Sequence, residues 1–229
     1  MIRLIDLFPI ELDRMNIQTI EVSGWAGALC GMRNPMDSWA KSDSYYDDDR
    51  NIVIGENDMK LVKSLTSSGP EHAKFLRMIH VQMNVNMPRY WWSEADTYHF
   101  NTKNSQSTMH KLLNRNTPIT RELFITCEED EDIVDVLVGR LESLRIAYKD
   151  IQKNATGSVK SEKLNHLLLR AKRILAEGFY QMRTMDTTYA EIRTMYFQRR
   201  PHRLTEEWLN TFCNWVESLP YAEPLITGE

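Results

Sequence analysis

The chain of 229 residues carries 28 basic and 32 acidic side chains, which give it a net charge of −4. Its 42% hydrophobic and 26% charged residues are typical of a folded globular protein and exclude overall disorder. The charge balance offers no basic surface for duplex nucleic acid, and the apolar runs are far shorter than the ~20 residues that cross a membrane. We therefore expect no duplex nucleic acid and no membrane among its partners. Binding of a single nucleotide, which needs only a few local cations, is not excluded.

The cysteines and the opening residues indicate the compartment. Cys30, Cys127 and Cys213 are far apart and odd in number, and no CxxC or Cys/His spacing is typical of a zinc site. The opening segment has an early acid, Asp6, and no small-residue cleavage site, so it does not resemble a secretory signal. We expect reduced thiols, a cytoplasmic location and no metal site.

The first third of the chain alternates short elements with polar segments. Residues 17–22 predict a strand, and the glycines in 25–35 indicate a turn region. Residues 36–54 are polar and acidic, which favours an exposed loop. Apolar residues three apart predict a helix within 56–68, which Gly-Pro at 69–70 ends, and a further helical turn follows at 71–76.

The clearest pattern lies at 79–87, where apolar and polar residues alternate strictly. This period of two predicts a half-buried strand, which Pro88 ends. The next residues predict a short aromatic helix that contains Trp91 and Trp92. A Trp pair on a helix is more often part of a core or a subunit interface than a stacking surface for a ring.

The second half predicts helices. An acidic run at 128–132 opens a long helix with an apolar stripe from Ile133 to Ile151, where the helix dipole favours acids. The remaining expected segments are a polar turn (153–163), helices over 164–175 and 186–199, a basic turn (198–203) and a last helix around 208–216. Without a repeat or a linker, we expect a single domain over residues 1–229 with an α/β (α+β) fold.

Familiar catalytic motifs are missing. The sequence has no GxGxxG, no P-loop, no GxSxG and no HExxH pattern. Two polar clusters remain, NSQSTMH at 104–110 and QRRPHR at 198–203. A polar loop that caps a helix is a sufficient explanation of the first cluster, because Ser and Asn are common caps.

The segment from 72 to 110 nevertheless resembles the signature region of the flavin-dependent thymidylate synthases. That family has a His at a helix start, an alternating strand that ends in Pro, a helix with a Gln, and then Arg-His-Arg-x-x-Ser-x-Asn-x-x-Ser-x-Arg. The pattern fits here without a gap: His72 is the early His, Pro88 ends the strand, and Asn104 and Ser107 occupy the Asn and second Ser positions. Thr102 stands for the first Ser.

The sequence departs from the family at several functional positions. Thr97, Tyr98 and His99 replace the Arg-His-Arg triplet, and Met109 replaces the final Arg. In addition, Glu94 stands for the Gln and Ser105 for the acidic residue before the second Ser. Each lost charge-assisted hydrogen bond to an anion is worth ~1.5–3 kcal/mol. The loss of the arginines should therefore weaken the affinity for FAD or the nucleotide unless other groups replace them. Glu94 is an acceptor only, when ionised, which favours a cytosine-type base over uracil.

A second stretch extends the resemblance. Lys172 lies where the family has an Arg before a Leu-Pro pair, and Arg199 follows it by twenty-seven residues, as a pyrimidine-contacting Arg does in the family. The resemblance thus implies that His72, Thr97, Tyr98 and His99 lie at the cofactor. It likewise implies that Glu94, Ser105, Ser107, Thr108, Lys172 and Arg199 bind the nucleotide. Ser107 and Arg199 are the candidate catalytic residues.

The function that the resemblance implies is transfer of a one-carbon unit from methylenetetrahydrofolate to a pyrimidine deoxynucleotide, dUMP or a related one. FAD is the implied cofactor and NADPH the implied electron donor. The implied architecture is a central mixed sheet with surrounding helices, assembled as a homotetramer. Two alternatives stay open: a catalytically degenerate nucleotide-binding or structural relative, and a protein-interaction module whose aromatic helix docks a partner.

Overall fold

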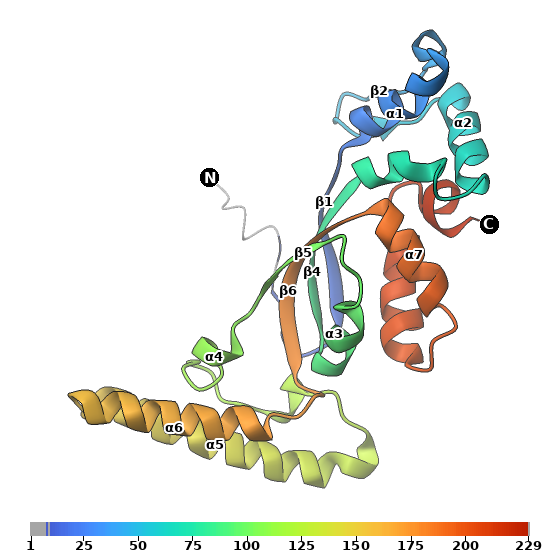
Figure 1. Cartoon of the computed structure of the whole chain (residues 1–229). Coiled ribbons are helices and arrows are strands. Elements are labelled where there is room, and N and C mark those ends of the chain that lie inside the picture. Colours follow the sequence, from blue (N-terminus) through green and yellow to red (C-terminus); the bar gives the residue numbers. More distant parts are fainter. Residues whose placement is uncertain (1–7, 9, 229) are drawn as a thin grey trace. The chain divides into compact units, whose positions relative to one another are not determined.

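The computed structural model describes residues 8 and 10–228, so the opening segment around Asp6 lies outside the described residues. Four strands form the main sheet (Figure 1), in the order β1 (Asn16–Ser23), β4 (His80–Pro88), β6 (Tyr180–Thr188), β5 (Thr102–Ser105). A small antiparallel pair, β2 (Tyr45–Tyr46) and β3 (Ile52–Val53), lies apart from it. The predicted class, α+β with a central sheet, is confirmed.

Helices make up most of the remaining described chain. The α-helices are α1 (Trp25–Arg33), α2 (Glu56–Ser67), α3 (Arg89–Ala95), α4 (Thr108–Lys111), α5 (Glu131–Asn154), α6 (Ser158–Ile174), α7 (Tyr189–Arg199) and α8 (Asn214–Glu217). The 3₁₀ segments are η2 (Asn34–Met36), η3 (Trp39–Lys41), η4 (Ala73–Met78), η5 (Arg121–Leu123) and η6 (Glu128–Asp130). Two π-helical segments, η7 (Glu206–Cys213) and η8 (Glu223–Thr227), lie near the end of the chain.

The chain folds into two compact units. Of the described residues, the first unit comprises 8, 10–16, 86–96 and 104–183, and the second comprises 17–85, 97–103 and 184–228. The boundary falls within each of the four strands of the main sheet, so each of these strands is divided between the two units. Whether the chain acts as one domain stays a prediction.

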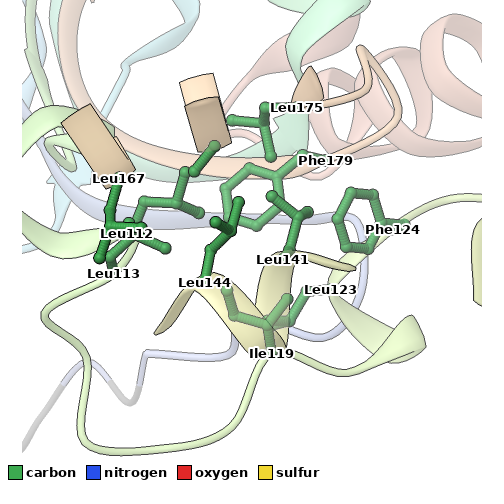
Figure 2. Close-up of a cluster of buried hydrophobic side chains, with 11 residues drawn as sticks. Leu112, Leu113, Ile119, Leu123, Phe124, Leu141, Leu144, Leu167, Leu175 and Phe179 are labelled. Carbon is green, nitrogen blue, oxygen red and sulfur yellow. The ribbon is translucent and has the colours of Figure 1, made fainter. Parts of the chain in front are cut away.

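The core of the first unit is a cluster of aliphatic and aromatic side chains, to which α5 and α6 contribute (Figure 2). Its members are Leu112, Leu113, Ile119, Leu123, Phe124, Leu141, Leu144, Leu167, Ala171, Leu175 and Phe179. The predicted acidic start of the long helix is present at η6 and α5. Ile133, the first residue of the predicted apolar stripe, is 65% exposed, because packing against the cluster begins at Val134 and Leu137.

The predicted turn over 25–35 is wrong, because most of it forms helix α1 in the second unit. Its buried residues Trp25, Ala28, Leu29 and Met32 have the helical spacing of three, four and seven, which the glycines concealed. A Cβ added to Gly27 would lie 3.1 Å from the Met78 side chain. The glycine therefore gives Met78 room to pack closely on the helix.

The predicted exposed loop at 36–54 is exposed over most of its length, but a buried carboxylate anchors it. Asp58 of α2 accepts hydrogen bonds from Arg33 (2.8 Å), Ser42 (2.7 Å) and Ser44 (2.6 Å). Burial alone would raise the pKa of Asp58, but these bonds outweigh burial and lower the pKa. The ionised carboxylate therefore fixes residues 42–44 to α2.

Strand β4 confirms the predicted strand, although the alternation in burial ends at Met83 and both faces are buried from Asn84 onward. Trp91 and Trp92 on α3 are core residues, each 1% exposed, with ring centroids 4.9 Å apart. Strands β5 and β6 were not predicted. Their sequences TKNS and YQMRTMDTT are too polar to show a buried face, and residues 186–188 belong to β6 rather than to the following helix.

Candidate functional site

Two pockets contain residues that the family resemblance singles out, and each pocket lies within one unit. The triplet pocket, in the second unit, has a volume of about 700 Å³ and includes Thr97, Tyr98 and His99 in its lining. The Ser107 pocket, in the first unit, has a volume of about 600 Å³ and includes Ser107 and Thr108. Both volumes lie in the usual range of small-molecule sites, ~300–1,000 Å³.

The triplet pocket forms where three segments of the second unit meet. The 97–100 loop supplies one part of the lining, residues of α7 a second, and the segment from Thr66 to Arg77 a third. His72 follows two lining residues, Gly69 and Pro70, but is itself an exposed side chain 3.7 Å from Glu71. The three triplet positions therefore line one pocket, and His72 is not among the described residues of that lining.

A buried carboxylate that the sequence reading missed holds the 97–100 loop. One oxygen of Glu191 accepts the backbone N–H of Phe100 at 2.7 Å. The other accepts the Asn101 amide at 2.8 Å and the Thr187 hydroxyl at 2.7 Å. Glu191 is only 6% exposed, and these three donors satisfy both oxygens of its buried carboxyl group. Nothing in the local sequence distinguishes it from a surface glutamate.

Arg199 contacts the same loop. Its Nε donates to the Tyr98 hydroxyl at 2.9 Å, and that hydroxyl donates to Gln198 at 2.9 Å. The guanidinium lies over the rings of Tyr98 and Trp208, at 5.4 and 4.6 Å from their centroids. Two predicted site residues, Tyr98 and Arg199, are therefore direct partners, although Arg199 is not part of the described lining of the pocket.

The Ser107 pocket combines hydroxyls with cations. Lys172 of α6 donates from Nζ to the Thr108 hydroxyl at 2.5 Å, so two predicted nucleotide-binding residues meet. Burial lowers the pKa of Lys172, and the positive charge of Arg89 lowers it further. Lys172 is not among the described residues that line the pocket, but Lys111 and Arg115 are, which makes this part of the first unit basic.

The capping explanation of the 104–110 cluster is also realised. Ser107 is the N-cap of α4, and its hydroxyl accepts the backbone N–H of His110 at 3.2 Å. Ser105 is an exposed residue of β5, and Glu94 is a partly buried residue of α3. Neither is among the described residues that line the Ser107 pocket.

Metal-ligand side chains and thiols are further candidates for chemistry in the described part of the chain, where Cys30 and Cys127 are exposed and Cys213 is buried. Within it, no three His, Cys, Asp or Glu side chains come together as a metal-binding group. Burial, with a smaller effect of Glu217, raises the pKa of the Cys213 thiol to about 11, so this thiol is a weak nucleophile at neutral pH. None of the described helices combines the length and hydrophobicity of a membrane span.

Comparison with known proteins identifies the fold. No protein-family model and no curated protein sequence matches the chain. Among solved structures, a thymidylate synthase X from Helicobacter pylori with FAD and dUMP matches at a TM-score of 0.67 and 14% identity, over 93% of this chain and 97% of that one. A second Helicobacter pylori structure, of the flavin-dependent thymidylate synthase ThyX complexed with FAD and dUMP, gives 0.66 and 15%, over 93% and 98%.

A third structure extends the comparison. The UMP/dUMP methylase PolB from Streptomyces cacaoi, bound with 5-Br dUMP, matches at a TM-score of 0.57 and 13% identity, over 93% of this chain and 95% of that one. At these identities the matches establish the fold. The chain therefore has the fold of the flavin-dependent thymidylate synthases over nearly its whole length, as the resemblance predicted.

Proposed function

We propose that this protein is a flavin-dependent enzyme that transfers a one-carbon unit to a pyrimidine deoxynucleotide, dUMP or a close relative. The observation that carries the proposal is the pair of pockets, one at the triplet positions and one at the second Ser of the signature. The two Helicobacter pylori structures of the same fold hold FAD and dUMP. We also propose a cytoplasmic homotetramer, as the family resemblance implies.

The triplet pocket suits FAD in size and in chemistry. Tyr98, Phe100 and Phe197 offer aromatic faces to a ring system. Hydroxyls come from Thr188, at the end of β6, and from Thr194 of α7. FAD, when bound, supplies the redox chemistry, with NADPH and methylenetetrahydrofolate as co-substrates. The residues of this chain bind and orient the cofactor, and Glu191 keeps the loop with Thr97, Tyr98 and His99 in place.

The Ser107 pocket suits the phosphate of the nucleotide. Lys111 and Arg115 supply positive charge in the lining, and Lys172 adds a further cation beside it, bonded to the hydroxyl of the lining residue Thr108. In this proposal Ser107 contacts the pyrimidine nucleotide, while Glu94 and Ser105, which belong to the same unit, bind its polar edge. The catalytic role of Arg199, a residue of the second unit, stays a prediction. Trp91 and Trp92 take no part in ring stacking, because both are buried in the core.

Spectroscopy and titration of the purified protein test the proposal. We expect a yellow preparation or, after removal of flavin, FAD binding that raises the melting temperature, followed by binding of dUMP. UMP and CMP are titrated in parallel to define the base. A colourless protein whose stability FAD does not change contradicts the enzyme proposal, and nucleotide binding without flavin then favours the non-catalytic relative.

A further inference from the structure

The triplet pocket contains two arginines that the signature motif does not include. Arg77 comes from η4 and Arg193 from α7, and both line the pocket together with Thr97, Tyr98 and His99. In the sequence they are far from the triplet and from each other. The fold therefore brings two guanidinium groups to the place where the motif has lost two.

Arg193 is held in a fixed orientation. Its Nη1 donates to the backbone carbonyls of Ile226 at 2.6 Å and Gly228 at 3.0 Å, and its guanidinium lies 5.0 Å from the ring centroid of Phe197. Burial lowers the pKa of Arg193, but a guanidinium stays protonated at any pH that a protein tolerates. A side chain anchored in this way loses little entropy when it binds an anion.

The described lining contains one acid, Glu191, against the two arginines, so its charge offsets only one of them. Both carboxylate oxygens of Glu191 already accept hydrogen bonds, from Phe100, Asn101 and Thr187. Arg77 is exposed, and no described side chain forms an ion pair with it. Two arginines against one internally bonded glutamate leave the pocket positive.

We propose that Arg77 and Arg193 bind the phosphate groups of the dinucleotide cofactor, in place of the arginines that are missing from the triplet. The inference rests on the proposed function. Guanidinium groups match phosphate oxygens in pairs, and the aromatic side chains of the pocket provide surfaces for the rings of the same ligand. The pocket thus fits an anionic, aromatic dinucleotide rather than a neutral flavin.

Flavin titrations of the full chain test this assignment. Binding of FAD and of riboflavin, which has no phosphate, is measured by flavin fluorescence for the wild type, Arg77→Gln, Arg193→Gln and Arg193→Lys. Arg203→Gln, which changes an exposed arginine of the same unit outside the pocket, is the matched control. We expect each Gln variant to bind FAD at least tenfold more weakly and riboflavin unchanged, with Arg193→Lys intermediate and Arg203→Gln like the wild type.

The outcomes separate this inference from the proposed function. FAD affinity that stays at the wild-type value in Arg77→Gln and Arg193→Gln, or falls equally for FAD and riboflavin, contradicts the inference alone. Absence of FAD binding to the wild type contradicts the proposed function. NADPH is titrated as well, since it carries the same phosphate chemistry, and a loss confined to NADPH overturns the assignment to flavin. If Arg193→Gln does not fold, Arg77→Gln still tests the inference, because Arg77 is exposed and its substitution should leave the melting temperature of the free protein unchanged.

Discussion

Lys172, a partly buried cation beside the Ser107 pocket, links nucleotide binding to pH. Its Nζ lies 2.5 Å from the Thr108 hydroxyl, and burial together with Arg89 lowers its pKa below the ordinary 10.5. The lower pKa means that Lys172 loses its proton at a less alkaline pH than a surface lysine does. A phosphate bound beside it favours the charged form. Nucleotide binding is therefore linked to proton uptake by this residue.

We predict that dUMP affinity falls as the pH rises through the lowered pKa of Lys172, with a limiting slope of ~tenfold per pH unit for one proton. The dissociation constant measured by calorimetry between pH 7 and 10 reports the fall. Lys172→Arg should remove it, because arginine stays charged, and Lys172→Met should weaken binding even at pH 7. The same alkaline fall in Lys172→Arg would assign the effect to another group.

Helix α1 shows how an element depends on a contact remote in sequence. Gly24 precedes the helix with φ 87°, a left-handed conformation that suits glycine, and a Cβ there would lie 1.9 Å from the Met78 carbonyl oxygen. Gly139, in contrast, lies inside α5 with nothing within 4 Å of an added Cβ. The two positions differ in backbone and in surroundings, so the same substitution has opposite effects.

We predict that Gly24→Ala lowers the free energy of unfolding by ~2 kcal/mol or more, since both the backbone conformation and the Met78 carbonyl oppose a methyl group. Gly139→Ala should raise it by about 1 kcal/mol, the difference in helix propensity between the two residues. Urea denaturation midpoints of the wild type and both variants measure these changes. A Gly24→Ala variant as stable as the wild type would contradict the close contact with Met78.

At the scale of the whole molecule, the two pockets are lined by separate units. The triplet pocket draws its lining from residues of the second unit, and the Ser107 pocket from residues of the first. The signature segment passes through both, since 97–103 belongs to one unit and 104–110 to the other. Cofactor and nucleotide should therefore leave distinct footprints on the chain.

We predict that hydrogen exchange measured by mass spectrometry separates these footprints. FAD should slow exchange in the 97–101 loop and α7, and dUMP should slow it at 106–112 and around Lys172, because each ligand orders the unit that binds it. A Lys172→Met sample serves as the control for the nucleotide footprint. Protection of α7 alone by dUMP would contradict the assignment of the Ser107 pocket to the nucleotide.

Local patterns in the sequence predicted much of this architecture. The alternation at 79–87 indicated β4, and the acidic run and the leucine spacing indicated α5. The adjacent Trp pair was expected in a core or a subunit interface, and it lies in the core. These predictions hold because hydrophobic periodicity and helix capping depend on residues only a few positions apart, so both can be read from the local sequence. The signature segment likewise indicated the fold, since its spacing is kept without a gap.

Only the tertiary structure decided which polar partner each charged side chain of the candidate site contacts. Glu191 with Asn101, Lys172 with Thr108, and Arg199 with Tyr98 join residues 64 to 101 positions apart, and such pairings leave no trace in local periodicity. The same holds for Arg77 and Arg193, which reach one pocket from η4 and α7. The sequence by itself determined the elements and the family likeness, because these follow from near neighbours and spacing. The chemistry of the two pockets depends on long-range packing, which places the cations that the motif lacks.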